Sequence, residues 1–302
     1  MRTRLSGMLD SSRTDGPRVG LALMIEPEFV RAAYPLFEAG EVEVLEWSFD
    51  TLWSGASAPQ WMPELLENYS NASSLLGHGV TYSMFTADSP PRAERWCKRL
   101  ADECRTRRYC HVTEHFGFMI AGDFHRGAPL PVPFTSELLA LGRDRVQRLA
   151  DAVEVPVGLE NLAFAFGIDD VRTQGDFLHA LLAPVNGFVL LDLHNIHCQA
   201  YNFDISPEDL LEGYPLDMVR ELHLSGGSWS EAAGATVRRD THDGPIPEEL
   251  FPLLRHALDV CPNVDAVIFE HLGNALPDAL SIDRYREDFR HAARIVHEFR
   301  EP

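Results

Sequence analysis

Short apolar runs and longer amphipathic stretches alternate along this chain. Eight of the shorter runs have the length of buried strands. The stretches between them repeat apolar positions every three or four residues, as helices do when they pack one face against a sheet. The predicted strands cover residues 19–24, 42–48, 74–78, 109–115, 155–160, 188–191, 219–224 and 264–270. The predicted helices cover residues 27–39, 92–108, 173–182, 207–212, 247–260 and 282–299, with one more from about residue 63 and one from the N-cap residue Thr135 to Val153.

Strand and helix alternate eight times over about 280 residues. No linker rich in Pro, Gly or Ser and no block of like charge divides the pattern, so one domain is expected. The predicted fold is therefore of the α/β class, a single (β/α)₈ TIM-like barrel over residues 18–300. Residues 1–17 are polar and are expected to form a flexible N-terminal tail.

Composition and charge narrow the class of partner. The chain has 302 residues, of which 45% are hydrophobic, and 46 acidic against 26 basic residues give a formal charge of -20. Such a charge repels a phosphate backbone, so nucleic acid is not expected as a partner. The five cysteines form no CxxC pair and are expected to be reduced thiols, and no apolar run is long enough for a signal peptide or a membrane span. We therefore expect a cytoplasmic protein.

Polar groups follow the apolar runs where predicted strands end. In the segment GFVLLDLHNIH, residues 187–197, a buried run ends abruptly in Asp192, His194, Asn195 and His197. Taken alone, this stretch fits a catalytic site and a simple Asp or Asn cap equally well. The pattern recurs, however, and the ends of the third to eighth predicted strands read His78, His115, Glu160, Asp192, His223 and Glu270.

In a TIM barrel these strand ends meet at one rim, where active sites are built. Asn195, Asp240 and His242 follow in the loops just beyond the same rim. All nine side chains offer nitrogen or oxygen donors and none is a thiolate, which favours iron, manganese or zinc. Nine ligands exceed the need of one ion, so the sequence predicts two or three ions. Glu160 and Glu270 are suited to bridge neighbouring ions, because a carboxylate has two oxygens.

Seven short segments carry a resemblance to a known family. They are HGV at His78, EH at His115, LEN at Glu160, LLDLHN at Asp192, ELHLSG at His223, DTHD at Asp240 and FEH at Glu270. In this order and spacing they resemble the multinuclear non-heme iron-dependent oxidative enzymes (MNIOs), which include the methanobactin-biosynthesis oxidase. The resemblance covers about residues 19–298, nearly the whole chain.

The resemblance implies a TIM-like barrel that uses two or three iron ions, with dioxygen as co-substrate. Such enzymes oxidise or rearrange a residue, often cysteine, of a ribosomally made precursor peptide, which a partner protein commonly presents. Carried over by position, it implies three ion sites. They are His78, His115 and Glu160 for one ion, Glu160, Asp192, His223 and Glu270 for a second, and Asn195, Asp240 and His242 for a third.

The chain also departs from the family pattern near the presumed pocket. Tyr82, Met84 and Phe85 follow HGV where the family tends to have smaller residues, and His194 stands where the family often has asparagine. These departures concern the substrate rather than the metals. The larger aromatic residues are equally consistent with a pocket wall and with the core, and they are Tyr82, Phe85, Phe164, Phe166 and Trp229.

Some other residues are expected to have structural roles. Cys198 is expected to be a buried structural thiol. Six histidines away from the predicted strand ends are interpreted as surface or packing residues, namely His111, His125, His179, His256, His291 and His297.

Three functions remain open at this point. The leading hypothesis is an oxygen-dependent iron enzyme that modifies a peptide or a related small substrate. The alternative is a non-redox zinc or manganese barrel, an isomerase or hydrolase similar to the sugar isomerases or the apurinic endonucleases, whose metals activate water or polarise a carbonyl. The charge of -20 counts against a nuclease but not against an isomerase. A metal-binding accessory protein without catalysis is the third.

Overall fold

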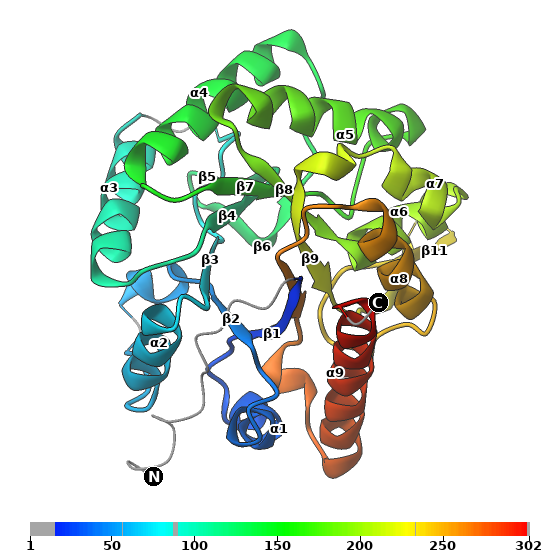
Figure 1. Cartoon of the computed structure of the whole chain (residues 1–302). Coiled ribbons are helices and arrows are strands. Elements are labelled where there is room, and N and C mark those ends of the chain that lie inside the picture. The colour runs from blue at the N-terminus through cyan, green and yellow to red at the C-terminus, as the bar shows by residue number, and fades with distance from the viewer. Residues whose placement is uncertain (1–15, 56, 87–89, 233, 301–302) are drawn as a thin grey trace.

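Eight parallel strands close into a barrel at the centre of the molecule (Figure 1). The computed structural model describes residues 16–55, 57–86, 90–232 and 234–300, so most of the predicted tail lies outside the described residues. Around the barrel the strand order is β1-β12-β9-β8-β7-β4-β3-β2, which confirms the predicted (β/α)₈ fold. The strands are β1 (Arg18–Ala22), β2 (Val44–Trp47), β3 (Leu75–Gly79), β4 (Val112–His115), β7 (Val157–Glu160), β8 (Phe188–Asp192), β9 (Val219–Leu224) and β12 (Ala266–Phe269).

Helices surround the barrel and cover its outer face (Figure 1). They are α1 (Pro27–Glu38), α2 (Met62–Asn71), α3 (Pro90–Thr106), α4 (Ser136–Ala152), α5 (Ile168–Leu182), α6 (Leu193–Phe203), α7 (Pro207–Glu212), α8 (Leu250–Val260) and α9 (Ala279–Arg300). Four short 3₁₀ turns lie at η1 (Thr51–Ser54), η2 (Ala183–Val185), η3 (Leu216–Met218) and η4 (Gly273–Ala275). As predicted, the hydroxyl of Thr135 caps α4 by accepting a hydrogen bond from the Leu138 amide at 3.3 Å.

The main hydrophobic core lies between the barrel and the helices, while the barrel interior is shared between apolar and ionisable side chains. A separate small cluster is formed by alternate residues of β1, β2, β3 and β12, which are Ala22, Val44, Leu76, Ala266 and Ile268. On β7, a Cβ atom at Gly158 would lie 2.5 Å from the Phe188 ring, so only glycine leaves room for that ring. Toward the carboxyl ends of the strands the interior becomes polar, and this end holds the candidate site.

The structure differs from the predicted elements in three places. Helix α6 begins directly after Asp192, where no helix was predicted. Residues 116–133, which belong to none of the predicted strands and helices, contain the hairpin β5 (Phe118–Ala121) and β6 (Phe124–Leu130). The loop between β9 and α8 contains a second hairpin, β10 (Trp229–Ala232) and β11 (Ala235–Arg238).

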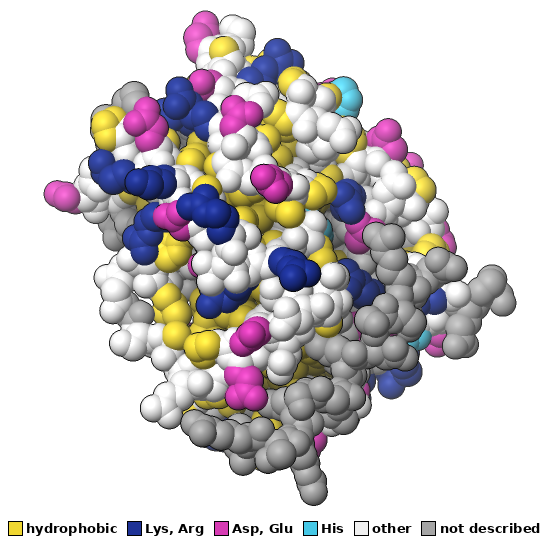
Figure 2. Space-filling view, turned by 60° about the vertical axis from the view of Figure 1, so that its left-hand side comes forward, with side chains coloured by type: hydrophobic (Ala, Val, Ile, Leu, Met, Phe, Trp, Pro, Cys, Tyr) yellow, Lys and Arg dark blue, Asp and Glu magenta, His cyan; other side chains and the backbone are white. Residues whose placement is uncertain are grey.

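The outer surface mixes charges of both signs. On the face shown in Figure 2, Lys and Arg side chains are interspersed with Asp and Glu and with apolar atoms. Some of these charges pair along one helix, as Arg148 and Asp144 do at 2.8 Å on α4. Among the described residues, no helix combines the length and the apolar character needed to cross a membrane.

Candidate metal centre

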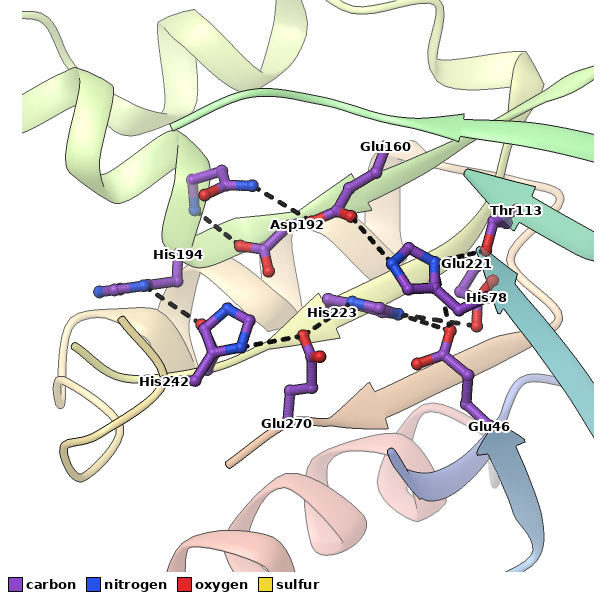
Figure 3. A network of polar contacts seen from close by, with 12 residues as sticks. Glu46, His78, Thr113, Glu160, Asp192, His194, Glu221, His223, His242 and Glu270 are labelled. Atoms are coloured by element: carbon purple, nitrogen blue, oxygen red, sulfur yellow. Dashed lines mark hydrogen bonds and ion pairs between the residues drawn. The ribbon is translucent and has the colours of Figure 1, made fainter. Parts of the chain in front are cut away.

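The strand-end residues predicted from the sequence converge at the carboxyl end of the barrel (Figure 3). His78 is the second-last residue of β3, while His115 ends β4 and Glu160 ends β7. The Glu160 Oε2 atom lies 3.5 Å from His78 Nε2 and 3.4 Å from His115 Nε2. The structure thus brings together the three residues that the resemblance assigns to one ion.

Hydrogen bonds at the Nδ1 atoms of His78 and His115 determine which nitrogen of each imidazole is unprotonated. His115 Nδ1 lies 3.2 Å from the carbonyl oxygen of Gly79, which can only accept, so Nδ1 carries the proton. His78 Nδ1 lies 2.8 Å from the Thr113 hydroxyl, which itself donates to a carbonyl oxygen and therefore accepts from His78. Both Nε2 atoms are then unprotonated and face a carboxylate oxygen. Lone pairs that face each other in this way are stabilised by a metal ion or a proton between them.

Two further groups of ligand atoms adjoin the first. Glu160, Asp192 and His223 form one group and Asp192, His242 and Glu270 the other, and within each group the ligand atoms all lie within 4.8 Å of one another. His223 Nδ1 is 3.3 Å and His242 Nδ1 is 3.6 Å from the same Glu270 oxygen. Glu160 and Asp192 each belong to two groups, so they are placed to bridge ions.

Unpartnered buried atoms test whether these residues fit metal ions. Buried polar atoms in native proteins nearly always have a hydrogen-bond partner. Here Glu160 Oε2, Asp192 Oδ2 and His223 Nδ1 are buried without one. These are atoms of the three residues that form the central group, so the donor set fits bound cations, which would supply the missing partners.

Asp192 has both of the roles that the sequence left open. Its Oδ1 atom accepts a hydrogen bond from the Asn195 amide at 2.6 Å and so caps α6. Its Oδ2 atom is the unpartnered one and faces the centre. Asn161 holds the backbone of Asp192 through two hydrogen bonds, of 2.7 and 3.2 Å. The cap therefore leaves Oδ2 available as a ligand atom.

Asp240 and His242, which the resemblance assigns with Asn195 to a third ion, lie side by side. His242 also forms a group of ligand atoms with Asp192 and Glu270. The Asp240 carboxylate lies 2.9 Å from His194 Nδ1 and 3.0 Å from His242 Nε2. Asn195 donates its amide to Asn161 and Glu160, which leaves its buried Oδ1 atom unpartnered. Asp240 thus adjoins His242, and Asn195 adjoins Glu160.

Sequence reasoning missed a layer of ionisable residues below the centre. Glu46, Glu221 and His223 form a further group of buried ligand atoms. His111, which was interpreted as a surface or packing residue, lies in the barrel with Nε2 2.8 Å from Glu221 and its ring against Phe188. The signal for Glu221 was its place two residues before His223, because alternate residues of a strand share a face.

His194 was noted in the sequence but given no role. It is buried, and Arg238 Nε donates a hydrogen bond to its Nε2 atom at 3.2 Å. Its proton therefore lies on Nδ1, which donates to Asp240. Cys198 is a buried free thiol, as expected, and its sulfur lies 3.8 Å from the same imidazole.

A narrow recess opens above the centre. Its walls combine site residues with apolar side chains from β6 and from the loop after β7, and they are His115, Ala128, Pro129, Glu160, Ala163, Phe164, Asn195 and Asp240. Of the aromatic residues that were left open between pocket and core, only Phe164 lines it. Tyr82, Met84 and Phe85 belong to the hydrophobic core, while Phe166 and Trp229 are exposed.

Burial and neighbouring charges shift the pKa values of the carboxylates at the centre. Burial raises the pKa of Asp192 to about 7, and the neighbouring Asp240 adds to this effect. Burial likewise raises the pKa of Glu46 to about 7 and that of Glu160 well above its usual range. At Glu270 burial also opposes the charged form, but His242 and His223 outweigh it and lower the pKa to about 2.

We expect the metal-free protein to lose stability as the pH rises from about 5 to about 8. Asp192 and Glu46 have pKa values of about 7 in the fold against 3.8 and 4.5 for the free groups. Between these values the folded chain holds protons that the unfolded chain has released. This stabilisation is complete below the unfolded pKa and is lost as the pH rises through about 7. Bound cations replace the protons, so the metal-loaded protein should lack this decline.

Thermal unfolding of chelator-treated and metal-loaded protein across this pH range measures the effect. The difference in Tm between the two forms should widen with pH. A constant difference from pH 5 to pH 8 would show that the buried carboxylates do not govern the stability of the metal-free protein.

The sequence of the chain matches a known protein family. Residues 42–294 match the sequence profile of a family described as RiPP precursor modification enzyme MbnB/TglH/ChrH. Among curated relatives, a UPF0276 protein of Caulobacter vibrioides is 31% identical over 182 residues, which are 60% of this chain and 62% of that protein. The chain therefore spans about three-fifths of the length of the curated relatives it matches.

Solved structures share the fold. The IOLI protein with a bound zinc atom superposes with a TM-score of 0.62 and 13% identity, over 93% of this chain and 99% of that one. D-Psicose 3-epimerase from Clostridium cellulolyticum H10 superposes with a TM-score of 0.58 and 13% identity, over 92% and 99%. At these identities the similarity shows the TIM-barrel fold alone.

Proposed function

The chain belongs to the MbnB/TglH/ChrH family of RiPP precursor modification enzymes, and on that premise we propose that it is a multinuclear, oxygen-dependent iron enzyme. Its substrate is a ribosomally made precursor peptide or a related small molecule, in which it oxidatively modifies cysteine or another side chain. A partner protein that presents the peptide is part of this proposal. The observation that carries the proposal is the convergence of the unpartnered atoms of Glu160, Asp192 and His223 beneath one recess.

The residues of the chain divide the work between holding ions and admitting substrate. His78, His115 and Glu160 would hold one ion, and the groups that share Asp192 would hold one or two more. These nitrogen and oxygen donors suit iron, manganese or zinc, and iron is proposed because the resemblance to the MNIO family implies it. Bound iron would supply the exchange of electrons with dioxygen. The recess above the centre has apolar walls that keep water away and polar groups at its base that orient a side chain.

Metal analysis and oxygen uptake test this proposal. Protein reconstituted without oxygen should hold at least two iron ions per chain, as elemental analysis and Mössbauer spectra would measure. With a panel of cysteine- and aspartate-containing peptides, with and without candidate partner proteins, it should consume oxygen and change the peptide mass. Full zinc occupancy with retained activity would refute the iron assignment, and no oxygen uptake with any peptide would refute the oxidase.

We expect Phe164→Ala to change the range of substrates or the ratio of products without changing the metal content. The side chain of Phe164 lines the recess but is not a metal ligand, so its loss widens the recess only. Phe166→Ala is the matched control, because Phe166 is 67% exposed and lies outside the recess walls. Oxygen uptake and product mass across the peptide panel, with iron content measured beside them, would compare the variants. Identical product patterns for both variants and wild type would remove Phe164 from the specificity wall.

A non-redox zinc or manganese isomerase is the second candidate. It is favoured by the fold shared with a zinc-containing structure and with a sugar epimerase. In that case the same ligands would hold ions that polarise a carbonyl or activate water. The metal found in protein purified without added metal separates the two candidates, since only the oxidase requires iron.

A further inference from the structure

Glu46, on β2, lies beneath His223 in the barrel and is 1% exposed (Figure 3). We propose that Glu46 is a positioning residue for the metal centre. It accepts a hydrogen bond from His223 Nε2–H, turns His223 Nδ1 toward the ions and contributes a negative charge below them. The proposal rests on the metal-binding part of the proposed function and is independent of the oxidase chemistry.

The surroundings of His223 determine where its proton lies. The Nδ1 atom has no hydrogen-bond partner and lies 3.3 Å from Glu270 Oε2, within the group of ligand atoms. The Nε2 atom faces the opposite way and lies 3.2 Å from Glu46 Oε2. A carboxylate next to Nε2 favours the tautomer with the proton on that nitrogen, which frees Nδ1 to bind a metal.

Among the described residues, only Glu46 is placed to accept a hydrogen bond from His223 Nε2. Glu221 Oε1 is 3.8 Å from His223 Nε2, beyond hydrogen-bond distance, and Glu221 Oε2 is engaged by His111 at 2.8 Å. His78 Nδ1 lies 3.9 Å from Glu46 and already has Thr113 as its partner. Glu46 is thus the closest acceptor for the Nε2 proton of His223.

The charge of Glu46 has no fixed cation beside it. Its ion-pair contacts within the described part of the chain are to the imidazoles of His223 and His78, and its Oε1 atom is buried without a hydrogen bond. In a medium of low polarity, such a charge acts on the nearest cations. Those would be the bound ions, since the imidazole of His223 joins Glu46 to the centre. Glu46 should therefore strengthen metal binding and favour the higher oxidation state of a redox-active ion.

Two substitutions separate the hydrogen bond from the charge. Glu46→Gln keeps the shape and an acceptor oxygen but removes the charge, whereas Glu46→Leu removes both. Partners of metal-binding histidines typically contribute ten- to a hundredfold in affinity. We expect zinc affinity to fall roughly tenfold in Glu46→Gln and about a hundredfold in Glu46→Leu. With iron bound, the reduction potential of Glu46→Gln should be more positive than that of wild type.

Glu43→Gln is the matched control. Glu43 directly precedes β2 but lies at the opposite end of the barrel, where it accepts from the Val19 amide at 2.8 Å and pairs with Arg300. Its loss should leave zinc affinity and potential unchanged. Equal zinc affinity and equal potential in Glu46→Gln, Glu46→Leu, Glu43→Gln and wild type would overturn the proposal.

A measurement on unaltered protein keeps the test decisive if the variants fail to fold. In zinc-loaded wild type with ¹⁵N-labelled histidine, NMR should show His223 protonated on Nε2 and bound to metal through Nδ1. Protonation on Nδ1 would overturn the proposal. Because zinc is used, this result does not depend on iron or dioxygen, so failure of the oxidase hypothesis would leave it intact.

Discussion

Glu160→Gln is expected to lose more than one bound ion and all measurable turnover. The Glu160 carboxylate belongs to two groups of ligand atoms, and its Oε2 atom faces both His78 and His115. An amide bridges two cations poorly and brings no charge to offset them. Both ions should therefore be lost, and with them the activity.

Metal content per chain and oxygen uptake, measured on the same preparation, provide the readout. His179→Ala is the control, since His179 lies on α5 and in no group of ligand atoms. It should leave both quantities unchanged. If Glu160→Gln retained the full metal content of wild type, Glu160 would not be a bridging ligand.

Asp192→Asn and Asp192→Ala should lose metal to the same extent but differ in stability. Asp192 is shared by two groups of ligand atoms through its unpartnered Oδ2, while its Oδ1 caps α6. Asparagine keeps an oxygen that can accept from the Asn195 amide, whereas alanine removes the cap. The free energy of unfolding of the alanine variant should therefore be about 1 kcal/mol lower than that of the asparagine variant.

Denaturant unfolding of both variants in metal-free form isolates the cap, and metal analysis isolates the ligand. Metal-free protein is needed because bound ions would add their own stabilisation. If both variants were equally stable, the hydrogen bond from Asn195 would contribute nothing to the fold. If Asp192→Asn retained all ions, the unpartnered oxygen would not be a ligand.

The barrel and the strand-end residues could be predicted because both depend on short-range pattern. Each predicted strand overlaps an observed one, and His78, His115, Glu160 and Asp192 are the last or near-last residues of theirs. A parallel barrel places such positions at one rim whatever the details of its loops. The grouping of His242 with Asp192 was not predictable, because it depends on the path of a loop that the strand pattern does not determine.

The missed elements share a physical cause. Helix α6 begins inside the polar cluster, so its first turn, with His194 and Asn195, carries the signature of a site rather than of an apolar helix face. Glu46 and Glu221 lie within strands that otherwise read as apolar, and their partners are remote in sequence. Phe85 was open between pocket and core because aromatic residues serve both, and only packing against Phe116 places it in the core.

The spread of the ligands along the chain sets the order of events during synthesis. His78 is on β3 and Glu270 follows β12, and the ring of strands closes only when β12 pairs with β1. A partial chain that lacks the last strand has His78, His115 and Glu160 but not Glu270, so the full set of ligands is present only after the ring has closed. We expect ions to enter through the recess lined by β6 and the loop after β7. On the proposed function, the full set of ions would be loaded after folding, and the supply of metal at that moment would decide which ion the protein carries.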